Sequence, residues 1–292
     1  MSSGVAFARE RAVRIPGMKT SRQPKRLSAR KLDRSRILTG KVAVVTGAGS
    51  GMGRATARLM AEVGASVVVL SLKREEVENV VKEIRASGGK AQGLVADVSD
   101  GSTPARMVQR AVEAFGRLDI LVNNAAYFER QEVFKMPESA WQKMIDVIYS
   151  AAFRLSQAAA RQMTQQGQPG YIINVTSIEG SYADAGAPHY GSAKGALNQL
   201  TRCLAVELAP HNVMVNAVAP GFIDTPMSVV DGKNELEDEA YLEWYVRRRK
   251  IPLARAGKPE EVAEAIVFLA SPLNGYITGH VLTVDGGLTC TF

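Results

Sequence analysis

The strongest constraint on the fold of this chain is an alternation of short apolar runs with longer amphipathic stretches. Seven runs rich in Val, Ile and Ala follow one another from Lys41 onward: KVAVVTG, SVVVLS, AQGLVADV, LDILVNNA, YIINVTS, NVMVNAVAP and HVLTVDGG. Such runs are typical of strands buried on both faces. The stretches between them place apolar residues three and four positions apart, which predicts helices over 52–63, 74–87, 102–116, 138–166, 191–209 and 259–270. Together they predict an α/β fold with one doubly wound parallel sheet and helices on both faces.

The composition fits a globular protein with a large core. Of the 292 residues, 46% are hydrophobic and 22% are charged. No run reaches the roughly 18 to 20 apolar residues that span a bilayer, and the start of the chain has no apolar block typical of a secretory signal. The two cysteines, Cys203 and Cys290, form neither a disulfide framework nor a metal-ligand spacing. We therefore expect a cytoplasmic protein without a metal site or a membrane partner.

The positive charge is concentrated in one segment. Residues 1–36 contain 11 Lys or Arg and two acidic residues, a net charge of +9, whereas the rest has 25 basic and 27 acidic residues, a net charge of −2. A slightly acidic domain gives no reason to expect nucleic-acid binding. We expect a disordered extension over 1–36 and one catalytic domain over 37–292. The extension is interpreted as dispensable; the alternatives are an over-long start, an Arg-rich organelle presequence and a tether for polyanions.

One segment interrupts the alternation of strands and helices. Residues 227–250 read MSVVDGKNELEDEAYLEWYVRRRK and are polar and aromatic. Long excursions in compact domains are often functional, so we interpret this insertion as a lid or substrate loop. Its WYVRRRK part suits a solvated helix with one buried aromatic residue equally well.

A glycine-rich turn follows the first predicted strand. The turn TGAGSGMG, Thr46 to Gly53, joins KVAVV to an amphipathic helix. A strand that leads through glycines into a helix presents free backbone N–H groups and the positive end of the helix dipole, which suits a pyrophosphate. The spacing is T-G-x-x-x-G-x-G rather than G-x-G-x-x-G. Such a turn alone also occurs as a plain strand-to-helix connection, but within this alternation it predicts a dinucleotide site.

The end of the second predicted strand bears on the type of dinucleotide. A fold that prefers NAD places a carboxylate there for the ribose hydroxyls. This chain has Ser71 at that position, followed by Lys73 and Arg74, which can pair with a 2′-phosphate. The two basic residues also suit the solvated start of the next helix. On balance NADP is favoured over NAD.

The sequence YGSAK suggests a proton-transfer pair. Tyr190 and Lys194 are four positions apart and therefore share one face of the predicted helix. A nearby ammonium lowers the pKa of a phenol, which makes it useful as a general acid and base. Ser177 ends a predicted strand upstream, where its hydroxyl can donate to a substrate oxygen.

These motifs, in this order, resemble the short-chain dehydrogenase/reductase family over about residues 38–288. The matching pieces are TGAGSGMG, ADV, NNAA, Ser177, YGSAK, NAVAPGFIDT, IPLARAGKPEEVAEAIVFLAS and YITGHVLTVDGG. The resemblance implies a single Rossmann-type domain in which Tyr190 is the general acid and base, Lys194 lowers its pKa and binds the nicotinamide ribose, and Ser177 orients the substrate. It also implies a homotetramer or homodimer that assembles through the helices at 138–166 and 191–209.

The resemblance further implies a set of cofactor contacts along the carboxyl ends of the strands. They are Gly47, Gly49, Ser50, Gly51, Met52, Gly53, Ser71, Lys73, Asp97, Val98, Asn124, Ala125, Tyr190, Lys194, Pro220, Gly221, Ile223 and Thr225.

Two positions depart from the family pattern. The family's NNAG is NNAA here, so that Ala126 adds one methyl group near the cofactor. The family usually has an asparagine after DV, where it positions a water that connects the lysine to solvent; this chain has Ile148. An aliphatic side chain cannot bond that water, so we expect a proton path rebuilt from backbone carbonyls and other waters, or a slower one.

The function expected from the sequence is an NAD(P)-dependent interconversion of a secondary alcohol and a ketone, acting on a small-molecule substrate. The alternative is a dinucleotide-binding sensor or scaffold with little turnover, which Ile148 leaves open. No motif in the sequence identifies the substrate. Candidates to line its cleft are Glu179, Tyr182, Trp244 and Tyr245, and His189 beside Tyr190 is expected at the rim at most.

Overall fold

The computed structural model describes residues 36–230 and 232–291. The predictions made for the basic extension, apart from Arg36, lie outside the described residues. The described residues fall within one compact unit of the chain.

All seven predicted strands form, and they make one parallel sheet. They are β1 (Val42–Thr46), β2 (Ser66–Ser71), β3 (Lys90–Val95), β4 (Ile120–Asn123), β5 (Gly170–Val175), β6 (Val213–Pro220) and β9 (Val281–Val284). Their order in the sheet is β3-β2-β1-β4-β5-β6-β9. The order reverses direction between β1 and β4, and ligands of open α/β sheets bind at the carboxyl ends of the strands beside such a switch point.

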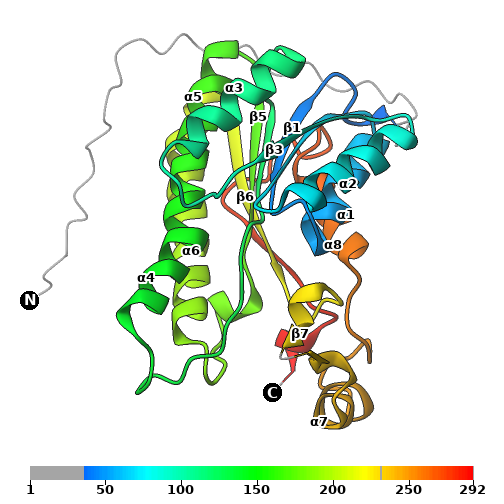
Figure 1. Cartoon of the computed structure of the whole chain (residues 1–292), viewed down its shortest axis with the longest axis vertical. Helices are drawn as coiled ribbons and strands as arrows, with labels where there is room; N and C mark the ends of the chain where they lie inside the picture. The colour runs from blue at the N-terminus through cyan, green and yellow to red at the C-terminus, as the bar shows by residue number, and fades with distance from the viewer. Residues whose placement is uncertain (1–35, 231, 292) are drawn as a thin grey trace, which may run out of the picture. The chain divides into compact units, whose positions relative to one another are not determined.

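Helices cover both faces of the sheet, as predicted (Figure 1). One layer contains α1 (Gly51–Glu62), α2 (Arg74–Ala86) and α8 (Pro259–Leu269). The other contains α3 (Thr103–Phe115), α4 (Glu138–Ile145), α5 (Ala151–Gln166) and α6 (Pro188–Leu208). Every residue of β1, β4 and β5 is buried, because these central strands have a helical layer on each side.

The prediction of one uninterrupted helix over 138–166 was wrong in one respect. A π-helical segment, η2 (Asp146–Ser150), separates α4 from α5, and the N–H of Ala151 bonds to the carbonyl of Asp146, five residues back. The apolar spacing of a helix barely changes when one turn widens, so the pattern does not reveal it. The wide turn contains Ile148.

The insertion folds into short elements beside the end of the sheet. It contains η5 (Pro226–Ser228), the hairpin of β7 (Val229–Val230) and β8 (Lys233–Asn234), η6 (Glu235–Glu237), α7 (Glu239–Tyr241) and the π-helical η7 (Leu242–Arg247). Tyr241 is buried against Phe222, which follows β6, with ring centroids 5.1 Å apart. Tyr245 also packs on Phe222, at 4.7 Å. The insertion is thus anchored by aromatic contacts to the loop that follows β6.

Three short 3-10 turns complete the fold: η3 (Ile178–Gly180), η4 (Ala209–His211) and η8 (Leu288–Cys290). Within residues 36–230 and 232–291, no helix is long and apolar enough to cross a membrane.

Candidate active site

The glycine-rich turn between β1 and α1 has the geometry of a phosphate cradle. A Cβ on Gly53 would lie 2.3 Å from the carbonyl oxygen of Gly47, so only a glycine lets the first turn of α1 pack on this backbone. Gly47 has φ +61°, in the region that favours glycine. Ser50 caps α1 without a side-chain hydrogen bond, and the first turn contains no acidic residue. These residues fit the pyrophosphate of a dinucleotide.

Side chains from β1 and from the end of β4 hold this turn in place. The Thr46 hydroxyl accepts hydrogen bonds from the backbone N–H groups of Asn124 (2.9 Å) and Ala125 (3.0 Å). The Asn124 amide donates to the carbonyl oxygens of Thr46 (2.9 Å) and Gly47 (3.3 Å). The Asn124 side chain therefore holds the backbone of the glycine-rich turn in place through two hydrogen bonds.

The region next to Ser71 contains a carboxylate that sequence reasoning missed. A Cβ on Gly49 would lie 2.9 Å from Ser71 Oγ and 2.5 Å from Glu76 Oε2, so all three residues meet. Lys73 Nζ forms an ion pair with Glu76 Oε1 at 2.9 Å. Glu76 lies five residues after Ser71 in the sequence, and this short separation is the one signal that could have drawn attention to it. The sequence does not show that the first turn of α2 lies over the glycine turn.

The other predicted cofactor contacts lie around the same edge of the sheet. Gly51 faces Thr225, because a Cβ on this glycine would lie 3.3 Å from the Thr225 side chain. This contact joins the loop after β6 to the N-terminus of α1. Asp97 is exposed, and its carboxylate accepts hydrogen bonds from Ser99 N (2.8 Å) and Ser99 Oγ (2.6 Å). Buried or half-buried positions are taken by Met52, Val98, Ala125, Pro220, Gly221 and Ile223.

Ser177, Tyr190 and Lys194 come together at the carboxyl end of β5. Ser177 follows β5 and is 8% exposed, and the α6 residues Tyr190 and Lys194 are 7% and 2% exposed. The side chains of Ser177 and Tyr190 share a hydrogen bond. Lys194 Nζ lies 5.5 Å from the Tyr190 ring centre and donates to the Val175 carbonyl at 2.7 Å. Phe128 packs edge-on against the Tyr190 ring at 5.2 Å.

The pKa directions differ from the prediction. Burial raises the pKa of Tyr190 above its ordinary value, the charge of Glu179 raises it further, and the hydrogen bond with Ser177 opposes both. Burial lowers the pKa of Lys194 to about 7, against an opposite effect of Glu179. In the chain without cofactor the Tyr190 pKa is therefore raised rather than lowered, with burial as the largest cause.

Ile148 lies on the inner side of this site, within an apolar environment. It is 2% exposed and belongs to the same buried cluster as Tyr190 and Leu197. A cavity of about 10 Å³ lies between Ile148, Val175 and Asn123, mostly lined by apolar side chains. That volume is at the lower limit for one water molecule. This cavity is thus too small for a chain of several waters.

The placement of His189 differs from expectation. Its side chain is 0% exposed rather than at the rim. Its two ring nitrogens are buried without a hydrogen-bond partner among the described residues. Burial lowers the pKa of His189, against an opposite effect of the Glu129 charge.

The outer side of the site is formed by three loops that meet at Arg130. Its guanidinium donates to Asp184 Oδ2 (3.3 Å) and to the Ala185 carbonyl (3.1 Å), and it pairs with Glu235 of the insertion at 3.5 Å. The same guanidinium lies 5.5 Å from the centre of the Phe128 ring. Among the expected cleft residues, Glu179 is half-buried, whereas Tyr182 and Trp244 are exposed.

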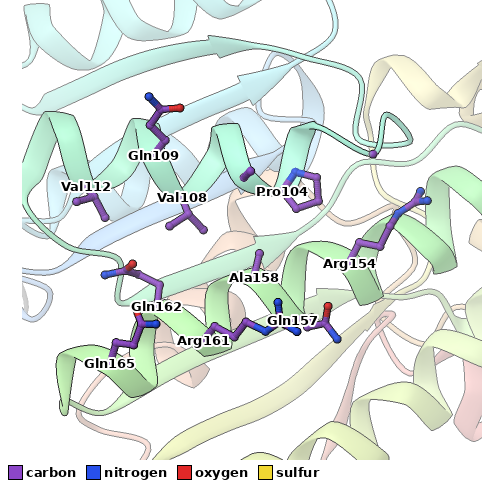
Figure 2. A pocket seen from close by; sticks show the side chains of 12 residues that line it. Pro104, Val108, Gln109, Val112, Arg154, Gln157, Ala158, Arg161, Gln162 and Gln165 are labelled. Carbon is purple, nitrogen blue, oxygen red and sulfur yellow. The ribbon is translucent and has the colours of Figure 1, made fainter.

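A cavity outside this site lies between α3 and α5 (Figure 2). It measures about 670 Å³ and is open to one side. Glutamines, two arginines of α5 (Arg154 and Arg161) and a few small apolar residues line it. None of the predicted catalytic or cofactor residues contributes to it, so its size does not mark the active site.

Comparison with known proteins decides the family. The family model described as enoyl-(acyl carrier protein) reductase matches residues 47–289. The 3-oxoacyl-[acyl-carrier-protein] reductase of Thermotoga maritima is 40% identical over 251 residues, which cover 86% of this chain and 98% of that protein. This chain belongs to the short-chain dehydrogenase/reductase family. As a member of that family, it is an NAD(P)-dependent oxidoreductase that acts on CH–OH groups and their ketones.

Solved structures of other short-chain dehydrogenases/reductases agree with this assignment. One from Mycobacterium marinum has a TM-score of 0.81 at 36% identity, with 88% of this chain and 98% of that chain covered. A gluconate 5-dehydrogenase from Burkholderia cenocepacia, in complex with NADP and tartrate, has a TM-score of 0.81 at 31% identity, with 89% and 99% covered. The solved structures thus share the fold of this chain, and the substrates in the names of the gluconate 5-dehydrogenase and the 3-oxoacyl-[acyl-carrier-protein] reductase differ.

Proposed function

We propose that this enzyme reduces a ketone to a secondary alcohol, and catalyses the reverse reaction, with Tyr190 as the general acid and base. The observation that supports this most is the convergence of Ser177, Tyr190 and Lys194 at the carboxyl end of β5. The phosphate cradle opens onto the same edge of the sheet, which is where a dinucleotide binds in this architecture.

Each of the three side chains has a distinct task in this proposal. The Ser177 hydroxyl donates a hydrogen bond to the substrate oxygen and holds the reacting carbon in place. The Tyr190 phenol gives its proton to that oxygen during reduction and removes it during oxidation. A raised pKa keeps the phenol protonated at physiological pH, which suits the proton donor of a reduction. When bound, the nicotinamide cofactor supplies or accepts the hydride, and in its oxidised form it adds a positive charge.

Lys194 is assigned a positioning role. Its Nζ is buried and anchored to the Val175 carbonyl at 2.7 Å, at the end of the strand that precedes Ser177. An ammonium in this place has two further N–H donors for the hydroxyls of a nicotinamide ribose. Protons reach Tyr190 from the open side of the site in this proposal, because the side facing Ile148 is apolar.

The cofactor is assigned to the glycine turn and to the loops after β3, β4 and β6, with NADP preferred over NAD. The end of β2 has Ser71 in place of a carboxylate. Lys73 is exposed, and its pair with Glu76 is a surface ion pair, which is worth little on its own. A 2′-phosphate has a charge near −2 and can therefore compete for Lys73. The Glu76 carboxylate repels a 2′-phosphate and therefore reduces the preference for NADP over NAD.

We further propose that the enzyme assembles into a homotetramer, or at least a homodimer, through α5 and α6. Phe153 of α5 and Val206 of α6 are 43% and 79% exposed, so each helix offers apolar surface to such an interface. A mass measurement in solution that shows only monomer would contradict the assembly.

The function is tested by paired titration with NADPH and NADH, followed by a panel of ketones and alcohols read at the nicotinamide absorbance. We expect tighter binding of NADPH and turnover of at least one ketone. Tight binding of cofactor without turnover across the whole panel would instead support a dinucleotide sensor and overturn the proposal.

A further inference from the structure

Glu179 occupies a fixed position beside the catalytic hydroxyl. It lies two residues after Ser177 on the short turn η3, and its backbone N–H donates to Ser177 Oγ at 3.1 Å. The turn is held against α6, because a Cβ on Gly180 would lie 2.9 Å from the Lys194 carbonyl carbon. The Glu179 side chain therefore starts from a rigid backbone next to Tyr190 and Lys194.

One carboxylate oxygen of Glu179 is buried without a hydrogen-bond partner within the described part of the chain. This atom is Oε2. Buried carboxylate oxygens are nearly always bonded to a donor, since leaving one unpaired is costly. An acceptor of this kind beside a catalytic hydroxyl is suited to a donor that arrives with the substrate.

The cations near Glu179 are already engaged by other groups. The charged groups that act on its carboxylate are Asp184, Arg130, Lys194 and Glu235. Arg130 is bound to Asp184 and Glu235, and Lys194 donates to the Val175 carbonyl. Two other acids thus face Glu179, and burial together with Asp184 raises the pKa of Glu179 to about 7. With Glu179 ionised, its carboxylate and those of Asp184 and Glu235 outnumber the two cations, which disfavours a substrate carboxylate or phosphate.

We propose that Glu179 determines substrate specificity by accepting a hydrogen bond from a hydroxyl group of the substrate, so that the enzyme acts on neutral polyhydroxylated compounds in preference to carboxylated or phosphorylated ones. The inference rests on the proposed function of Ser177, Tyr190 and Lys194. A hydroxyl adjacent to the reacting carbon donates to the Glu179 carboxylate while the reacting oxygen binds Ser177 and Tyr190.

The test uses pairs of compounds that differ only at the end of the carbon chain. Sorbitol and gluconate share the five hydroxylated carbons C2–C6 and differ only at C1, which is a CH₂OH group or a carboxylate; ribitol and ribonate form a matching five-carbon pair. Simple secondary alcohols and ketones without further hydroxyls complete the panel. The wild-type full-length enzyme is expected to oxidise the polyols with a kcat/KM on the order of tenfold or more above that for the carboxylates.

Three variants separate recognition from folding. Glu179→Leu removes the acceptor, and the KM for the polyol is expected to rise on the order of tenfold with a smaller change in kcat. Glu179→Gln keeps an acceptor but removes the charge, so the polyol-to-carboxylate preference should fall on the order of tenfold. Glu132→Gln removes the same charge from an exposed position and is the matched control. The NADPH dissociation constant and the melting temperature check that the variants fold.

The outcomes distinguish this inference from the proposed function. A wild-type enzyme that prefers the carboxylates, or that turns over only simple alcohols, would overturn the role of Glu179 and leave the proposed function intact. Retention of the wild-type preference by both Glu179 variants would overturn that role as well. Absence of any turnover across alcohols and ketones would instead overturn the proposed function.

Discussion

Lys194 Nζ lies 5.5 Å from the centre of the Tyr190 ring and donates to the Val175 carbonyl at 2.7 Å. The Lys194 side chain is therefore held at the end of β5. Burial is the largest cause of the pKa shift of both residues. In the chain without cofactor the phenol keeps its proton and the pKa of Lys194 is lowered to about 7.

The first prediction concerns the cofactor preference. Lys73→Ala is expected to weaken NADPH binding on the order of tenfold, because it removes a charge-assisted bond to the 2′-phosphate, with little change for NADH. Glu76→Gln is expected to tighten NADPH binding, because it removes the carboxylate that lies between Ser71 and Lys73. Both are measured by fluorescence titration. Lys82→Ala, on the exposed side of α2, is the control, and an equal loss for NADH and NADPH in Lys73→Ala would contradict the assignment.

The second prediction concerns Ile148 in the π-helical turn. Ile148→Asn restores the residue type usual in the family but places an amide in an apolar cluster beside a cavity of about 10 Å³. We expect a loss of about 1–3 kcal/mol in the free energy of unfolding, measured by denaturant titration. Ile148→Val, which removes one methylene, should cost about 1 kcal/mol. An Asn variant as stable as the wild type would show that the site already accommodates a polar side chain and water.

The third prediction concerns the pH dependence of stability. The pKa of Glu179 is raised from 4.5 to about 7. Between these values the unfolded chain has released the proton and the folded chain has not, so stability falls as pH rises from about 4.5 to about 7. Glu179→Gln should remove this loss and raise the free energy of unfolding by about 1–3 kcal/mol at pH 8, with little effect at pH 4. A difference between variant and wild type that is independent of pH would contradict the burial of this carboxylate.

The fourth prediction concerns the ties between the insertion and the rest of the site. Arg130 links the loop after β4 to Asp184 and to Glu235. Because these ion pairs are half exposed, Arg130→Ala should change global stability by less than about 1 kcal/mol. It should nevertheless speed proteolytic cleavage within residues 227–250 and raise the substrate KM. The control is Lys135→Ala, which removes an ion pair with Glu132 on the same loop and should change neither the cleavage rate nor the substrate KM. Cleavage of Arg130→Ala as slow as that of the wild type would show that the insertion is held by its aromatic contacts alone.

The fold was largely predictable because each buried strand is a run of apolar residues. All seven runs became strands of the sheet, and the helices end within a few residues of the predicted bounds. The π-helical turn at Asp146–Ser150 was not predictable, because widening one turn leaves the apolar spacing almost unchanged.

The candidate site was predictable where a motif is local in sequence. Tyr190 and Lys194 share a helical face by their spacing, and the glycine turn follows its strand directly. Glu76 was missed because its approach to Gly49 depends on how α2 packs on the sheet. The direction of the Tyr190 pKa was also missed, because it depends on burial, which a pair of residue types does not reveal.

The central claim, that Tyr190 transfers the proton in an NAD(P)-dependent reaction at a CH–OH carbon, is tested most directly by Tyr190→Phe. The ring and its packing on Phe128 are retained, so the NADPH dissociation constant should stay within about twofold of the wild type. Turnover of any identified ketone or alcohol should fall by about 10²- to 10⁴-fold, the usual contribution of a general acid. Turnover within a few-fold of the wild type, at unchanged cofactor affinity, would contradict the role of Tyr190 as proton donor.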